Sequence, residues 1–436
     1  MGKSIRHSIV GPTAGKFKYE IREIVALANE LKAMGMEITW ENIGDPINKG
    51  ELLPEWIKEI VVKLVLDDSS WGYTATQGEL DTRKFLCERT NRRKGVRIRP
   101  EDIIFFNGLG DAVARMFGSM KREARIIGPS PAYPTHSSAE SAHSGYEHET
   151  YELMADDNWK PNLTEIENKI RYNDTIAGIL VINPGNPTGA VYGRDTMEAI
   201  VDIARRYGVM VIADEIYQEI TYNGARPVLL SDVIEEVPGI ALKGISKEFP
   251  WPGGRCGWFE VYNQHTDRSF REYIDSIVHA KMLEVCSTSL PQRAIPLVMG
   301  DSRYPNHLEQ RRRLFEARTN EACDIFNQVK GIKVIRPQGA FYMAIVFENG
   351  VLNDKQTLKI RDSKIQAFIE TRLNDLPLDK RFVYYLLAAK GVCVVPLTGF
   401  CCTTPGFRIT TLESNDQKRV STWHTITNAI TEYLNS

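Results

Sequence analysis

The stretch Ile176-Ala-Gly-Ile-Leu-Val-Ile-Asn-Pro-Gly-Asn-Pro-Thr-Gly189 is an apolar run followed by a loop with two prolines and two glycines. The run is apolar at consecutive positions, so it predicts a strand that is buried on both faces. Proline and glycine fix and bend the backbone, so the loop 183–189 is expected to be rigid. Asn186 would then present a fixed amide at the carboxyl end of a buried strand. A simple structural turn is the alternative interpretation.

Similar short apolar runs lie on both sides of this stretch, at 103–106, 124–127, 209–213 and 240–242. They alternate with helical patterns such as 195–207. Alternation of this kind predicts an α/β fold, with a mainly parallel central sheet covered by helices on both faces. Ligands of such sheets bind outside the carboxyl ends of the strands. We therefore expect the functional residues at those ends.

The pattern changes beyond about residue 310, where a long charged helix leads into strands near 332–335, 341–347, 392–396 and 407–411. The 436 residues have room for two domains. We predict a large domain over 49–310 and a small α+β domain over 311–436. The N-terminal segment 1–48 is expected to pack with the small domain.

Composition narrows the classes of function. The formal net charge is −2, so no large basic field exists to hold nucleic acid. No apolar run is long enough for a membrane span, and the N-terminus lacks the apolar core of a signal peptide. The seven cysteines show no metal-ligand spacing. We expect a cytoplasmic protein that binds no metal, nucleic acid or membrane.

Lys247 follows the run 240–242 and precedes the rigid segment Pro250-Trp-Pro-Gly-Gly254. A lysine held out of water between a strand and a turn has a lowered pKa, which makes its amine a nucleophile toward an aldehyde. Arg255, eight residues on, would suit an anionic group on the same ligand. A solvated surface lysine is the alternative.

Asp214 ends the run 209–213. A carboxylate at the end of a buried strand is costly unless it meets a cation or a hydrogen-bond donor. A protonated pyridine nitrogen is one such partner, and Tyr217 could reach a phenolic oxygen on the same ring. The alternative is that Asp214 caps the N-terminus of a following helix.

Gly108-Leu109-Gly110 follows the run 103–106 and opens a helix. The free amides of a helix N-terminus bind phosphate. A strand, a glycine-rich turn and a helix also begin dinucleotide-binding folds, but Val113 stands at the third glycine position, so that fingerprint is incomplete.

Together, these segments resemble the class I/II aminotransferases, the fold type I enzymes that use pyridoxal 5′-phosphate (PLP). The loop 183–189, Ala-Asp-Glu-Ile-Tyr217, Ser-Lys247 with Gly-x-Arg255-x-Gly, and Phe-Arg408-Ile occur in the family's order, from about residue 40 to 412. The resemblance implies a three-layer fold type I transferase whose smaller α+β domain uses both chain ends. It also implies a homodimer with shared active sites.

The resemblance assigns the cofactor's reactive ring to four residues. Lys247 is similar to the Schiff-base lysine that holds PLP and moves the substrate's α-proton. Asp214 matches the partner of the pyridine nitrogen. Asn186 and Tyr217 match the hydrogen-bond donors to the ring's phenolic oxygen, and Asn186 also belongs to the substrate site.

The remaining roles concern the phosphate, the ring face and the substrate. The phosphate residues implied by the resemblance are Gly108, Leu109, Gly110, Ser246 and Arg255, together with Tyr73 of the neighbouring subunit. Tyr133 matches the ring that stacks on the cofactor, Arg408 the clamp on the substrate α-carboxylate, and Gly44 a backbone contact to the substrate. One departure is Gly244, where the family usually carries a phosphate-binding serine.

These matches predict an aminotransferase that moves an amino group between an amino acid and a 2-oxo acid such as 2-oxoglutarate, by ping-pong kinetics. Aspartate and alanine are the favoured amino acids, and Lys16 and Arg293 are candidate cations for a second carboxylate. The nearest alternative is a PLP-dependent lyase or decarboxylase. A PLP-binding transcription regulator is disfavoured because family-like sequence begins near residue 40, and a nicotinamide dehydrogenase would need the incomplete glycine fingerprint.

Overall fold

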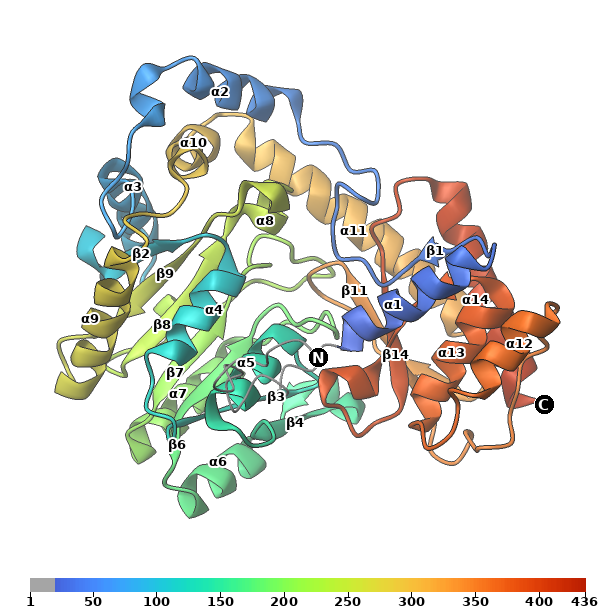
Figure 1. Ribbon diagram of the computed structural model, residues 1–436. Helices are drawn as coiled ribbons and strands as arrows, with labels where there is room; N and C mark the ends of the chain where they lie inside the picture. The colour runs from blue at the N-terminus through green and yellow to red at the C-terminus, as the bar shows by residue number, and fades with distance from the viewer. Residues whose placement is uncertain (1–19) are drawn as a thin grey trace, which may run out of the picture.

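The computed structural model describes residues 20–436, and its centre is an eight-stranded sheet (Figure 1). The spatial order is β2 (Ile103–Phe106), β9 (Gly257–Tyr262), β8 (Gly239–Gly244), β7 (Met210–Asp214), β6 (Ile176–Ile182), β3 (Arg125–Ser130), β4 (Thr150–Met154) and β5 (Lys160–Pro161). Only β9 and β5 oppose the others within this sheet. The predicted mainly parallel central sheet is therefore confirmed.

Helices cover both faces of this sheet because successive strand residues point to opposite sides. Ile104 and Phe106 pack in one core cluster with α4 and α9, whereas Ile103 and Phe105 pack in another with α3, α7 and α10. The first layer holds α4 (Leu109–Gly118), α5 (Pro134–Ser144) and α9 (Arg268–Met282). The second holds α3 (Leu80–Asn91), α6 (Leu163–Tyr172), α7 (Arg194–Tyr207) and α10 (Ser289–Met299). The result is the predicted three-layer arrangement.

Three strands of this sheet, β4, β5 and β9, were not among the predicted elements. In β9 the apolar pattern is interrupted by Glu260, which is 2% exposed. Its carboxylate is held 3.1 Å from the Lys243 amine and 3.0 Å from the Thr90 hydroxyl. These partners come from distant segments, so the sequence of β9 alone does not reveal a buried strand.

A smaller α+β region is built from both ends of the described chain, as predicted. Its antiparallel sheet has the order β10 (Ile332–Val334), β11 (Tyr342–Phe347), β14 (Gly406–Thr410) and β13 (Val395–Pro396). β1 (Thr39–Trp40) pairs in parallel with β12 (Val392–Cys393). The helices are α1 (Glu20–Ala33), α12 (Ser363–Glu370), α13 (Leu378–Lys390) and α14 (Asp416–Leu434), and Figure 1 shows α1 lying beside this C-terminal region.

Two helices, α2 (Glu55–Val65) and α11 (Tyr304–Phe326), complete the connections, with the short α8 (Ile245–Glu248) after β8. α11 runs unbroken across residue 310. The domain limits at 48/49 and 310/311 stay a prediction. No helix within residues 20–436 has the length and apolar character needed to cross a membrane.

The fold brings the chemically important loops to one edge. The segments that carry Leu109, Tyr133, Asn186 and Lys247 directly follow β2, β3, β6 and β8, and Asp214 is the last residue of β7. These strands are parallel, so their carboxyl ends lie together. The smaller sheet faces this edge from the other side.

Candidate active site

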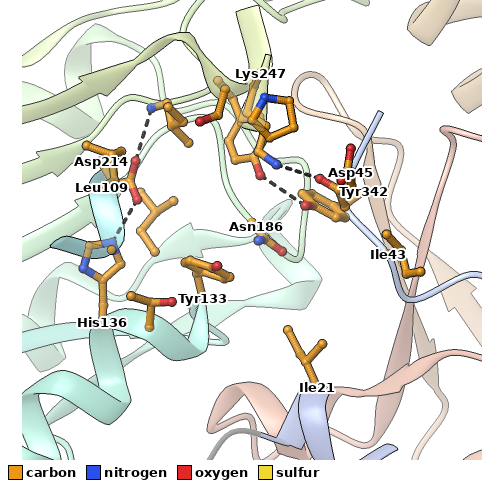
Figure 2. A pocket seen from close by; sticks show the side chains of 18 of the residues that line it. Ile21, Ile43, Asp45, Leu109, Tyr133, His136, Asn186, Asp214, Lys247 and Tyr342 are labelled. Carbon is orange, nitrogen blue, oxygen red and sulfur yellow. Dashed lines mark hydrogen bonds and ion pairs between the residues drawn. The ribbon is translucent and has the colours of Figure 1, made fainter. Parts of the chain in front are cut away.

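A cavity of about 540 Å³ lies between this edge and the smaller sheet. Most residues expected at the site line it: Gly44, Leu109, Gly110, Tyr133, Asn186, Asp214, Tyr217, Ser246, Lys247, Arg255 and Arg408. Figure 2 shows five of them around the cavity: Leu109, Tyr133, Asn186, Asp214 and Lys247. Two of the expected residues do not line it. Gly108 caps α4 just behind the lining, and Tyr73 is 84% exposed outside the cavity.

The Lys247 amine is directed into the cavity, where its Nζ donates a hydrogen bond of 2.6 Å to the carbonyl oxygen of Gly44. Burial lowers the pKa of Lys247 from its ordinary value of 10.5 to about 8. The positive charge of the nearby Arg408 contributes to this lowering of the pKa, and the Asp45 carboxylate opposes it. A substantial share of the amine is therefore neutral and nucleophilic at mildly alkaline pH.

The backbone of Lys247 is fixed by a residue that the sequence did not single out. Arg311 of α11 donates to the carbonyl oxygen of Lys247 at 2.5 Å and to that of Glu248 at 3.2 Å. The same guanidinium pairs with Glu51 at 2.6 Å. Arg311 therefore ties the lysine turn to the segment that precedes α2.

Asp214 is 4% exposed and contacts two donors. Its Oδ2 lies 2.8 Å from Nε2 of His136, and its Oδ1 accepts from the Ile216 amide at 3.2 Å. Nδ1 of His136 has no hydrogen-bond partner among residues 20–436, so the proton belongs on Nε2 and His136 donates to Asp214. A turn, not a helix, follows Asp214, so the alternative N-cap interpretation is wrong.

The N-terminus of α4 and Arg255 form a cationic corner of the cavity. Gly108 has a φ of +81°, and a side chain there would come within 2.5 Å of the Arg255 guanidinium. Glycine at 108 thus lets the guanidinium lie against the start of α4. The first amides of a helix have no intrahelical acceptor, so this corner suits an anion.

Gly244 is explained by packing. A side chain at this position would meet the carbonyl oxygen of Cys256 at 3.0 Å and the side chain of Ile216 at 3.1 Å. A serine would require its neighbours to shift. Ser246, two residues later, lines the cavity instead.

Arg408 lies on β14 and is 2% exposed. Its guanidinium donates to the carbonyl oxygen of Asn42 at 2.5 Å and to the side-chain oxygen of Asn186 at 3.1 Å. The ring of Tyr342 lies 4.5 Å from the guanidinium carbon. These contacts hold a cation in one orientation at the cavity wall.

Several cavity residues were missed from the sequence: Ile21, Arg22 and Val25 of α1, with Asn42, His136 and Tyr342. Ile21 and Val25 follow the helical period that also predicts an ordinary core helix. Tyr342 begins an apolar strand, so the sequence pattern predicts a core residue there and not a site residue. Of the two cations proposed for a second carboxylate, Arg293 instead pairs with Glu79 at 3.0 Å, and Lys16 lies outside the described residues.

Comparisons with known proteins agree with this geometry. Residues 40–421 match the family described as aminotransferase class I and II. An uncharacterized aminotransferase of Methanocaldococcus jannaschii is 50% identical, over 99% of this chain and 100% of its own. The glutamate-pyruvate aminotransferase AlaA of Haemophilus influenzae is 28% identical, over 90% and 91%. The solved alanine aminotransferase of Pyrococcus furiosus has a TM-score of 0.81 and 27% identity, over 98% and 99%.

The chain belongs to the class I and II aminotransferase family. It is an enzyme, a PLP-dependent aminotransferase of fold type I. The relatives named above are aminotransferases, which favours amino-group transfer over the alternative lyase or decarboxylase activity.

Proposed function

We propose that this enzyme transfers the amino group of alanine to 2-oxoglutarate by a ping-pong mechanism, with aspartate as the second candidate donor. The observation that carries the proposal is that Lys247, Asp214 and Arg408 line one cavity. The names of the AlaA and Pyrococcus relatives support alanine.

The cavity residues fit PLP. The low pKa of Lys247 suits attachment of an aldehyde, and the Asp214 carboxylate, steadied by His136, suits a protonated pyridine nitrogen. The corner formed by α4 and Arg255 suits a phosphate. The buried side-chain amide of Asn42, on the cavity wall, has no hydrogen-bond partner among residues 20–436, which supports a polar ligand there.

These positions support a cofactor-binding role for each residue. Lys247 would hold PLP covalently, Asp214 its ring nitrogen, and Asn186 and Tyr217 its phenolic oxygen. The phosphate would be held by Gly108, Leu109, Gly110, Ser246 and Arg255, with Tyr133 against the ring face. Bound PLP supplies an electron-withdrawing ring that stabilises negative charge at the substrate's α-carbon.

The substrate would be oriented by its α-carboxylate. Arg408 offers a planar pair of donors for this group, and Asn186 and Asn42 already hold the guanidinium. Gly44 lies beside the amine of Lys247. With the carboxylate bound at Arg408, the neutral amine of Lys247 would remove the α-proton.

A second cation, Arg22 of α1, also lines the cavity. Two arginines suit a substrate with two carboxylates, such as 2-oxoglutarate, in one half-reaction. Alanine needs only Arg408. The cavity would thus bind both 2-oxoglutarate, the longer amino-group acceptor, and alanine, the shorter amino-group donor.

We propose a cytoplasmic homodimer in which Tyr73 serves the neighbouring subunit. Exposed apolar side chains around α2, the short 3-10 helix Asp68–Trp71 and the α9–α10 connection support a subunit contact. Among them are Leu66 (79%), Trp71 (74%) and Leu283 (90%). Six cysteines are free thiols, which supports a reducing compartment: Cys87, Cys256, Cys286, Cys323, Cys393 and Cys402.

The half-reaction tests this function. Holoenzyme mixed with alanine alone should release about one equivalent of 2-oxo acid per site, and two-substrate rate plots should give parallel lines. Aspartate, tested in the same way, decides between the donors. Lys247→Ala should release none. Intersecting lines, or no release from any amino acid, would contradict the proposal.

A further inference from the structure

Tyr342 contacts residues from three separate parts of the chain at the cavity. It is the first residue of β11 and is 3% exposed. Its hydroxyl lies 3.2 Å from the Tyr217 hydroxyl, and the two rings meet edge to face at 5.8 Å. Its ring also lies 4.5 Å from the guanidinium carbon of Arg408. One side chain therefore joins the cofactor side of the cavity to the carboxylate side.

The third contact is with Gly44. A side chain at Gly44 would collide with the Tyr342 hydroxyl, so the phenol packs directly on the glycine backbone. The carbonyl oxygen of this glycine accepts the hydrogen bond from Lys247. Figure 2 shows Tyr342 next to Lys247 and Asp45 at this wall.

The two tyrosine hydroxyls can exchange donor and acceptor roles. Tyr217 donates to Tyr342 here, but a hydroxyl can rotate, and each oxygen can also accept. Once a ligand oxygen faces Tyr217, that hydroxyl can turn its proton toward the ligand and accept from Tyr342. A hydroxyl that accepts a hydrogen bond becomes a stronger donor.

We propose that Tyr342 is a positioning residue for transamination. Its hydroxyl aligns and strengthens the hydrogen bond from Tyr217 to the phenolic oxygen of PLP, and its ring holds Arg408 for the α-carboxylate. This inference rests on the proposed function. It adds a residue from the smaller sheet to the cofactor's hydrogen-bond network.

Other titratable groups face the same place. Tyr133 and Asp214 lie near Tyr217, and Arg408 and Asp45 lie near Tyr342. Lys247 borders the same cavity from α8. Tyr342→Phe leaves all of these groups in place, so a change in the cofactor's titration would report the lost hydroxyl.

The first experiment titrates the visible absorbance of PLP bound to the Tyr342→Phe holoenzyme. The hydrogen bond from Tyr217 favours the deprotonated form of the bound cofactor. In that form the phenolic oxygen carries a full negative charge, because no proton nearby offsets it. Weakening that bond should raise the pH midpoint by about 0.4–1 unit. The KM for alanine should stay near the wild-type value, because the ring that supports Arg408 remains.

Tyr342→Leu tests the ring. Loss of the stacked ring should raise the KM for alanine roughly 3- to 30-fold. Tyr222→Phe is the matched control, because its hydroxyl lies in the same aromatic cluster, 3.2 Å from the Thr319 hydroxyl, and does not line the cavity. That variant should keep both the midpoint and the KM.

An unchanged midpoint in Tyr342→Phe, or an equal shift in Tyr222→Phe, overturns the role of the hydroxyl. An unchanged KM in Tyr342→Leu overturns the role of the ring. In either case a wild-type enzyme that binds PLP and transaminates leaves the proposed function intact. A wild-type protein that never acquires the cofactor's absorbance overturns both.

Discussion

The amine of Lys247 shows how one residue acquires its chemistry from its surroundings. Burial and three guanidinium groups lower its pKa, and Asp45 is the main opposing charge. None of these neighbours except Arg255 is close to Lys247 in sequence. The lysine could be identified from its motif, but its low pKa arises only in the fold.

This pKa predicts how PLP attaches to the cofactor-free protein. Only the neutral amine attacks an aldehyde, and a lysine whose pKa is lowered to about 8 becomes neutral above that pH. The attachment rate should therefore rise with pH and level off above about 8. Stopped-flow absorbance at a series of pH values measures this. A rate that keeps rising toward pH 10 would show that burial does not lower the pKa.

Arg22 should affect one substrate only. Arg22→Gln removes a cation from the cavity wall and should raise the KM for 2-oxoglutarate about tenfold or more, because a charged hydrogen bond is lost. The KM for alanine should be nearly unchanged. Steady-state kinetics measures both values. Pyruvate, which has no second carboxylate, is the control acceptor and should be unaffected.

At the level of elements, the segment 41–51 places two backbone carbonyl groups in the cavity: that of Asn42 contacts Arg408, and that of Gly44 contacts Lys247. Buried charges hold the segment. The Lys49 amine lies 2.7 Å from Glu41 and 3.7 Å from Glu413. Burial raises the pKa of Glu41, and Lys49 opposes this effect.

Lys49→Met should therefore destabilise the protein by about 3–5 kcal/mol, because Glu41 would be left buried without its partner. Thermal unfolding measures the loss. Adding Glu41→Gln should recover part of it. Lys58→Met removes an exposed pair with Glu55 and should cost less than about 1 kcal/mol. Equal losses in the two single variants would argue against a special role for the buried pair.

At the scale of the whole molecule, much of the layout could be predicted because the strands of the central sheet carry local signals. Apolar runs in the sequence predicted the strands β2, β3, β6, β7 and β8. Residues at or just after the ends of these strands line the cavity. Contacts between segments far apart in the chain could not be predicted, because no local sequence pattern marks them. The bond from His136 to Asp214 spans 78 positions, and that from Tyr217 to Tyr342 spans 125.

The proposed subunit contact can be tested at the scale of the whole molecule. Trp71→Glu combined with Leu283→Glu places charges among the exposed apolar side chains and should convert a dimer to monomers. Sedimentation velocity measures the change. If Tyr73 contacts the PLP phosphate of the neighbouring subunit, the affinity for PLP should fall when the dimer dissociates. Tyr172→Glu changes an aromatic residue that is 81% exposed on α6 and should leave the dimer intact.

Helix α11 contacts the two segments that carry the residues proposed to act on the substrate, Lys247 and Arg408. Arg311 holds the carbonyl of Lys247, and Arg318, two turns later, donates to the carbonyls of Thr411 and Leu412, just beyond the strand that carries Arg408. The helix thus links the backbone at Lys247 to the end of the strand that carries Arg408, the proposed carboxylate-binding residue. Deleting one residue between the two arginines would rotate one against the other by about 100°. The distance between the Lys247 amine and Arg408 therefore depends in part on a helix whose residues lie outside the cavity lining.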